Sequence, residues 1–345
     1  MSTHTTNEAD HNTSVLPFPA YAGDDRTDED ILIQHGYDPT RFRVKYSTSN
    51  HWTTATSEGV VWNHQDKVQV EPIGIEGFDF EEQITAYLED VKPRALPATN
   101  PPKNKKTYYV VGLFDLHFGH MTYDDYRDYA QKITDTMAIG HKEIVLICGG
   151  DNLNENDYQG HTANLTPIGE TPHYHTGSAW QDYLLFLEEL VETARKHARS
   201  VRVIYVPGNH DESYGHTALM TLKRLYRNEK GVSVDAEQEV FKAFMVGHNF
   251  IGATHGHKGK VRDFPMLFAT NFASLWGKDG VTTRDLYTGH LHHEVVRDSG
   301  GLTHRQCATP ATPDRWHEDS GFTTAHNRGI SAVYSEYAVE MIRYL

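Results

Sequence analysis

The chain has 345 residues, which is enough for one large domain or for one large and one small domain. No apolar stretch approaches the roughly 18 residues of a membrane span, and the polar first residues lack the pattern of a signal peptide. The two Cys residues lie in no paired motif, so the composition argues against a disulfide scaffold or a cysteine-based zinc site. We expect a soluble cytoplasmic protein without a membrane partner.

The formal net charge of −15 is distributed unevenly along the chain. Residues 1–100 contain 7 Lys and Arg against 17 Asp and Glu, whereas residues 101–345 contain 25 against 30. Non-specific binding of nucleic acid depends on Lys and Arg that neutralise phosphates, so the acidic amino-terminal third is a poor platform for it. We expect that part of the chain to have another role, such as docking onto a protein partner.

The amino-terminal third is predicted to hold a small acidic α+β module over residues 27–92. Residues 1–26 before it are polar and without periodicity, which predicts a disordered tail. The module is expected to begin with a short helix over Asp28–Gln34, with Thr27 as its cap and Gly36 as its stop.

The rest of the module is expected to be strand-like and then helical. The pattern from Phe42 to Val70 favours strands around Trp52 and Trp62, whose rings are expected in the core rather than in a platform for stacking bases. A capping box predicts a helix over residues 79–91. Residues 93–106, rich in Pro, Asn and Lys, are predicted to be an exposed linker.

From residue 107 to 345, five apolar runs end in short clusters of Asp, Asn and His. The runs are rich in β-branched and aromatic residues, which is typical of buried strands; they are Tyr108–Phe114, Ile144–Cys148, Val201–Val206, Phe250–Ala253 and the weaker Leu286–Tyr287. The clusters that follow are Asp115-Leu116-His117, Gly150-Asp151-Asn152, Gly208-Asn209-His210-Asp211, His255-Gly256-His257 and Gly289-His290-Leu291-His292. Helices are expected between them at about 123–139, 179–198 and 217–226. Because open α/β sheets bind ligands at the carboxyl ends of their strands, we expect the clusters to form one site.

The donors in these clusters are carboxylates, amides and imidazoles, a set that suits manganese, iron or zinc. A single aspartate shared by two metals, for which Asp151 is the candidate, would hold them roughly 3.5–4 Å apart and clamp the attacking and leaving oxygens of a displacement. The sequence therefore predicts two divalent metal ions and hydrolysis at phosphorus.

The ordered clusters resemble the calcineurin-like metallophosphoesterase superfamily over residues 107–345, and within it are similar to the Mre11/SbcD nuclease branch and related phage-encoded phosphoesterases. The resemblance implies an α/β (α+β) fold of two packed mixed β-sheets flanked by helices, a four-layer sandwich. It implies that the protein is located in the cytoplasm of a bacterial or phage-infected cell. It also implies that the metal is Mn²⁺, with Fe or Zn as alternatives, and it hints at a homodimer.

The resemblance also assigns roles to the residues of the clusters. One metal would be bound by Asp115, His117, Asp151 and His292, and the other by Asp151, Asn209, His255 and His290. His210 falls where the family has its general acid, with Asp211 beside it to orient the ring. Both His255 and His257 are available in the fourth cluster; His255 is the expected ligand, which leaves His257 to face the substrate phosphate.

Substrate choice is expected to depend on loops, because metals recognise any phosphate. The longest candidate covers residues 152–178 and contains several His residues. Lys258, Lys260 and Arg262 follow the fourth cluster, and Arg315 with Trp316 could stack a base.

The favoured function is a DNA exonuclease or endonuclease, in which a hydroxide held between the metals attacks and His210 protonates the leaving oxygen. The first alternative is a small-molecule phosphatase or cyclic-nucleotide phosphodiesterase, favoured by the acidic balance and by the short chain after the fifth cluster. The second is a regulatory protein that docks through its amino-terminal module.

Overall fold

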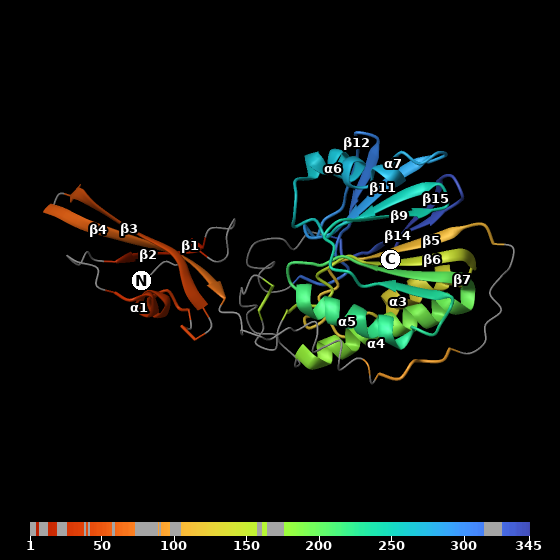
Figure 1. Cartoon of the computed structure of the whole chain (residues 1–345), viewed down its shortest axis with the longest axis horizontal. Helices are drawn as coiled ribbons and strands as arrows, with labels where there is room; N and C mark the ends of the chain where they lie inside the picture. Colours follow the sequence, from red (N-terminus) through yellow and green to blue (C-terminus); the bar gives the residue numbers. More distant parts are fainter. Residues whose placement is uncertain are drawn as a thin grey trace. The chain divides into compact units, whose positions relative to one another are not determined.

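The computed structural model describes residues 5–6, 13–18, 26–37, 39–40, 42–56, 59–72, 89, 91–96, 105–156, 161–163, 176–313 and 326–345. These residues fall into two compact units that divide at residue 84. Figure 1 labels their helices and strands. No helix among the described residues is both long and apolar enough to cross a bilayer.

The amino-terminal unit is a four-stranded antiparallel sheet with one helix. Its strands, in sheet order, are β1 (Thr5–Thr6), β2 (Thr13–Phe18), β4 (Gly59–Pro72) and β3 (Phe42–Thr56). α1 spans Asp28–Gln34 as predicted, and a capping box starts it, because the side chains of Thr27 and Asp30 each accept the other's backbone N–H. Leu32 of α1 forms the small core of this unit with Val68 and Val70 of β4.

Two features of this unit differ from the sequence-based expectations. Part of the tail predicted as disordered over residues 1–26 forms β1 and β2. The long strand β4 offers β2 a hydrogen-bonding edge that no local pattern reveals, and β2 in turn pairs with β1. Trp52 was expected in the core, yet it is 46% exposed, because so small a core leaves the second face of the sheet uncovered. The side chain of Trp62 lies outside what the structure describes. So does the helix predicted over residues 79–91, of which only residues 89 and 91 are described.

The second unit contains two mixed sheets and the helices on their outer faces. The six-stranded sheet has the order β15 (Val339–Tyr344), β14 (Ile330–Tyr334), β5 (Tyr108–Leu113), β6 (His141–Cys148), β7 (Ala198–Tyr205), β8 (Val232–Asp235). The five-stranded sheet has the order β12 (Val295–Ser299), β13 (Leu302–Gln306), β11 (Thr283–Thr288), β10 (Asn249–Ala253), β9 (Lys242–Val246). β5 to β8 run parallel to one another, and so do β10, β11 and β13.

Helices cover the outer faces of both sheets (Figure 1). α3 (Arg127–Met137), α4 (Thr176–His197) and α5 (Glu212–Leu225) lie on the six-stranded sheet, and η1 (Val261–Asp263), α6 (Phe264–Asn271) and α7 (Ala273–Trp276) lie by the five-stranded sheet. This is the predicted four-layer arrangement of two mixed sheets between helices.

Alternating side chains of the buried strands explain the layers. In β5, Tyr109 and Val111 point into the core beneath α3 to α5, whereas Tyr108 and Val110 point into the core between the two sheets. Such runs are apolar at every position because both faces of a central parallel strand are buried. Because β5, β6 and β7 run parallel to one another, and β10 and β11 do so too, each sheet carries its clusters at one edge.

α5 begins five residues earlier than predicted, directly after the third cluster. Gly215 lies inside it, and a Cβ there would stand only 3.0 Å from the Asp211 carboxylate and 3.1 Å from the hydroxyl of Tyr205. The glycine that weakens the helical pattern in the sequence is thus needed for close packing.

The segment predicted as an exposed linker over residues 93–106 packs against the second unit where it begins. The guanidinium of Arg94 forms ion pairs with Glu188 and Glu192 of α4, and its backbone N–H donates to the carbonyl of Leu225 at the end of α5. The backbone N–H of Leu96 donates to Glu229. Residues 93–95 are exposed as predicted, but long-range ion pairs of this kind leave no periodic signal, so the composition did not reveal the contacts of Arg94.

Candidate metal centre

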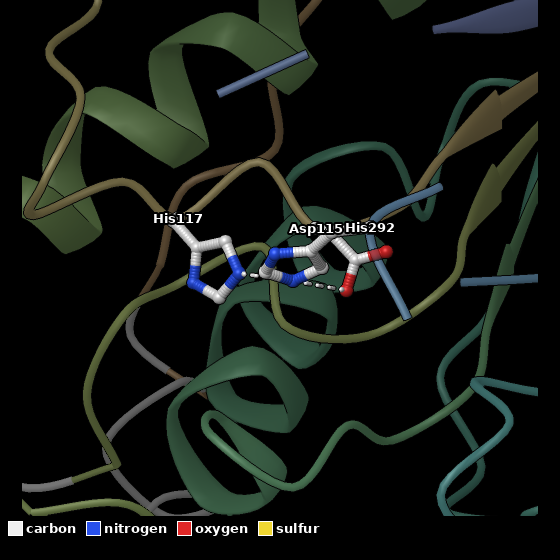
Figure 2. A group of neighbouring side chains, drawn as sticks. All are labelled: Asp115, His117 and His292. Atoms are coloured by element: carbon white, nitrogen blue, oxygen red, sulfur yellow. Dashed lines mark hydrogen bonds and ion pairs between the residues drawn. The ribbon is translucent and has the colours of Figure 1, made fainter. Parts of the chain in front are cut away.

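Two groups of potential metal donors lie at the carboxyl ends of the central strands. Asp115 and His117 follow β5 and meet His292, which follows β11 (Figure 2). Asp151 follows β6 and meets His255 and His290, which follow β10 and β11. Within each group the donor atoms lie within 4.8 Å of one another. The structure thus brings together residues from four strands that are far apart in sequence.

In the first group, the donor atoms converge on one point. His117 and His292 face each other through their Nε2 atoms at 3.2 Å, and Nε2 of His292 lies 3.5 Å from Oδ1 of Asp115 (Figure 2). Nδ1 of His117 is 3.1 Å from the side-chain oxygen of Asn154, an acceptor, so the proton of the neutral ring sits on Nδ1. The lone pair of His117 Nε2 is therefore directed at the other donors, as metal coordination requires.

The second group is built in the same way. Nε2 of His255 lies 3.0 Å from Oδ2 of Asp151 and 3.1 Å from Oδ1 of Asn209, while its Nδ1 is 3.0 Å from the carbonyl of Gly149. The carbonyl fixes the proton on Nδ1 and leaves Nε2 for a metal. Oδ1 of Asp151 accepts the backbone N–H of His210 at 2.8 Å, so Oδ2 is the oxygen of Asp151 that stays available.

The two groups adjoin each other. Nε2 of His255, in the second group, lies 4.0 Å from Oδ1 of Asp115, in the first. The carboxylate of Asp115 also accepts the backbone N–H of His290 at 2.9 Å. Borderline dications bind carboxylate and amide oxygens together with imidazoles. The Nδ1 atoms of His117 and His255 donate hydrogen bonds, which leaves their Nε2 atoms for a metal. The residues present therefore fit two such ions.

Backbone strain is concentrated at these groups. Among the described residues, the non-glycine residues with positive φ are five of the predicted ligands: Asp115, His117, Asp151, His290 and His292, with φ between 48° and 73°. Each such residue costs on the order of 1–3 kcal/mol and persists where the surrounding fold enforces it, which is typical of functional sites.

His210 is close to the first group, but the predicted contact with Asp211 is wrong. Nδ1 of His210 lies 3.0 Å from the carbonyl oxygen of Asn154, and its ring centre lies 5.2 Å from that of His117. The buried carboxylate of Asp211 points the other way and accepts the backbone N–H groups of Asp151 at 2.9 Å, Asn152 at 2.9 Å and Leu153 at 3.1 Å. Asp211 therefore shapes the second cluster, because three unpaired backbone donors in a buried turn outcompete one imidazole N–H.

The predicted substrate contacts are only partly described. His257 lies beside the second group, with its ring centre 5.3 Å from that of His255, and its buried Nδ1 has no hydrogen-bond partner in the described part of the chain. Lys258 and Lys260 follow on an exposed loop. Arg315, Trp316 and most of the predicted loop over residues 152–178 lie outside the described residues.

Two residues that touch the site were not singled out from the sequence. Asn154 contacts both His117 and His210, and the hydroxyl of Thr309 donates to the backbone carbonyl of Asp115 at 2.6 Å. The position of Asn154 three residues after Asp151 indicated that it lies near the site but not where its side chain points, since the side chain of Asn152 in the same turn contacts Tyr183 instead.

The pKa values of the residues at the site reflect burial and the charges of their neighbours. Burial, together with the nearby His292 and His210, lowers the pKa of His117 to about 3. Burial and His255 lower the pKa of His257 to about 3. Burial also opposes the charge on His255, but the carboxylates of Asp151 and Asp115 outweigh it and raise the pKa of His255 to about 9.

The carboxylates respond in the opposite sense. Burial disfavours the charged form of Asp151, yet the neighbouring His255 and His210 hold its pKa well below the usual value. For Asp115 burial is likewise outweighed by His292 and His255, so its pKa is lowered. Both carboxylates are thus ionised, and the proton on His255 balances charge that a dication would balance when bound.

The sandwich of two mixed sheets with paired donor groups at its strand ends defines a metal-dependent phosphoesterase. Residues 113–330 match the sequence model of the calcineurin-like phosphoesterases, which is well over half of the chain. The chain therefore belongs to the calcineurin-like phosphoesterase family. A search of curated proteins finds no significant match.

Several solved structures are similar to this chain at low identity. A Vps29 variant from Entamoeba histolytica is 15% identical, with a TM-score of 0.33, over 69% of this chain and 98% of that one. A predicted phosphoesterase from Streptococcus pneumoniae is 13% identical, with a TM-score of 0.29, over 71% and 99%. A putative 5'-nucleotidase from Staphylococcus aureus is 13% identical, with a TM-score of 0.35, over 69% of this chain and 53% of that one.

Proposed function

We propose that this chain is a binuclear phosphodiesterase that hydrolyses nucleic acid, most of all DNA, with Mn²⁺ as its metal. The observation that carries the proposal is the pair of adjoining donor groups, joined by the 4.0 Å approach of His255 to Asp115. Two dications held there would supply an activated water and a clamp for the oxygens of an in-line displacement.

The ligand assignment follows the contacts of the donor atoms. Asp115, His117 and His292 hold one metal, and Asn209, His255 and His290 hold the other. Asp151 would be the ligand that both metals share, and its Oδ2 is the oxygen that the backbone N–H of His210 leaves available. The strained backbone and the burial of Asp151 support this assignment.

His210 is the proton donor to the leaving oxygen. Nδ1 of His210 donates a hydrogen bond to the carbonyl of Asn154, so Nε2 is the nitrogen that would give its proton to the leaving oxygen. A positioned general acid contributes roughly 10²- to 10⁴-fold in rate.

The choice of nucleic acid rests on the loop after the fourth cluster. His257 lies beside the second donor group, and Lys258 and Lys260 extend from it into solvent, where they can meet neighbouring phosphates of a strand. A small phosphoester is the alternative, favoured by the excess of Asp and Glu over Lys and Arg, 47 against 32.

One assay separates these substrates and tests the acid. Hydrolysis of end-labelled single- and double-stranded DNA is compared with that of bis-p-nitrophenyl phosphate and p-nitrophenyl phosphate in Mn²⁺. Asp151→Ala should abolish all activity. His210→Ala should slow DNA cleavage roughly 10²-fold or more but affect the nitrophenyl esters little, because nitrophenolate leaves without a proton.

The control is His248→Ala, since His248 stacks on Tyr337 at the turn between β9 and β10, at the opposite end of these strands from the site. Turnover of the small esters alone, with DNA untouched, would replace the nuclease proposal with that of a small-molecule phosphoesterase.

For the amino-terminal unit we propose docking onto a protein partner. Tyr46 and Trp52 are 58% and 46% exposed and are six residues apart on β3, which places them on the same face of the sheet. The full chain and its Trp52→Ala variant would be compared for the proteins that each retains from a cell extract. If both retain the same proteins in equal amounts, the result would count against docking through this face.

A further inference from the structure

Asn154 makes two contacts with two imidazoles of different predicted roles. Its side-chain oxygen lies 3.1 Å from Nδ1 of His117, in the first donor group. Its backbone carbonyl oxygen lies 3.0 Å from Nδ1 of His210, the proposed acid. The side chain is buried, with 4% of the residue exposed. A single residue thus touches the outer nitrogen of both rings.

Both contacts fix where the protons of the two rings sit. An amide oxygen and a backbone carbonyl oxygen accept hydrogen bonds and cannot donate them, so each Nδ1 must carry a proton. The ring of His117 then presents a lone pair on Nε2 to the donors of the first group. Nε2 of His210 is left free for proton exchange.

Asn154 is itself held by backbone contacts on both sides. Its N–H donates to the carbonyl of Phe118 at 2.9 Å, and the N–H of Phe118 donates to the carbonyl of Asn152 at 2.9 Å. The N–H of His117 donates to the carbonyl of Asp151 at 3.1 Å. The first and second clusters are therefore joined like two short strands, and this pairing sets the distance between Asn154 and the His117 ring.

We propose that Asn154 is a positioning residue that orients His117 for metal binding through its side chain and His210 for proton transfer through its backbone. The inference rests on the proposed function, because it assumes that His117 is a metal ligand. It makes a separable prediction: substitution of the side chain removes the first contact and leaves the second. Metal affinity and proton transfer should therefore respond differently.

The test compares Asn154→Leu, which has a similar shape but no acceptor, with Asn154→Asp, which keeps an acceptor oxygen. Mn²⁺ affinity is measured by calorimetry on the full chain. Loss of an outer partner of a metal-binding His typically lowers metal affinity about 10- to 100-fold, and we expect that loss for Asn154→Leu but not for Asn154→Asp. ¹⁵N NMR of the imidazoles in the metal-free protein should show His117 losing its fixed Nδ1–H form in Asn154→Leu alone.

The matched control is Asn152→Leu. Asn152 is equally buried in the same turn, but its side-chain N–H donates to the hydroxyl of Tyr183 beneath α4 rather than to the site. This variant should lose stability and keep its Mn²⁺ affinity. The pH dependence of DNA cleavage should be unchanged in Asn154→Leu saturated with Mn²⁺, because the carbonyl contact with His210 remains.

The outcomes distinguish this inference from the proposed function. If the wild type binds Mn²⁺ and Asp115→Ala does not, the metal site stands; unchanged affinity in Asn154→Leu would then overturn the role of Asn154. Equal losses in Asn154→Leu and Asn154→Asp would also overturn it, because shape rather than the acceptor would matter. A wild type that binds no metal would refute the proposed function instead.

Discussion

Replacing Asp211 tests whether this residue supports the second cluster or orients the ring of His210. Its carboxylate, only 1% exposed, accepts three backbone N–H groups at 2.9 to 3.1 Å, those of residues 151 to 153. Asp211→Ala leaves all three donors buried without a partner. Removing one side of such a buried charged network costs about 4 kcal/mol, equivalent to a fall of roughly 10 °C in Tm.

Asp211→Asn should have about half that effect. Oδ1 serves one N–H and Oδ2 serves the other two, so an amide that keeps its oxygen on the Oδ2 side retains two contacts and opposes one N–H with its NH₂ group. Chemical denaturation of the metal-free protein would measure both variants. Asp263→Asn is the control, since this carboxylate is exposed and lies 3.5 Å from Arg262.

The reasoning would be refuted if both Asp211 variants unfolded within about 1 kcal/mol of the wild type, the size of a typical surface effect. A normal stability combined with a changed pH profile would favour the ring-orienting role that the sequence suggested.

Three further predictions concern other parts of the fold. Arg94→Ala should destabilise the second unit by about 1 kcal/mol in thermal unfolding, since its ion pairs are partly exposed, whereas Lys92→Ala should not. Burial and Arg297 lower the pKa of His304 to about 4. The folded state thus favours the neutral ring, and stability is lost as pH falls from about 6.5 towards 4; His304→Gln should reduce the loss between pH 7 and pH 5 by about 2 kcal/mol, and an equal loss would contradict this. Gly149→Ala should unfold or greatly destabilise the protein, because a Cβ there would lie 2.0 Å from the ring of Phe114; a soluble variant with a wild-type Tm would show that the ring can move.

The strands and the ligand set could be predicted because their signals are local. β5 is buried at every position, and β6 and β7 end in the apolar runs that were predicted as buried strands. The helix over Asp28–Gln34 was also readable, because its capping box and its glycine stop lie within a few residues of it. Local signals failed where long-range contacts decided the outcome, as for the strand β2 and for Arg94.

The sequence by itself determined the kind of chemistry. Asp, Asn and His follow apolar runs, and the residues that directly follow a strand lie at the edge of the sheet whatever their neighbours are. Only the tertiary structure decided which donors meet. His292 joins Asp115 and His290 joins Asp151 because of the order of the strands and the packing of the two sheets, which no spacing along the chain encodes. The same holds for Asp211 and Asn154, whose partners are chosen by the direction of a buried side chain and by the need to satisfy every backbone donor in the turn.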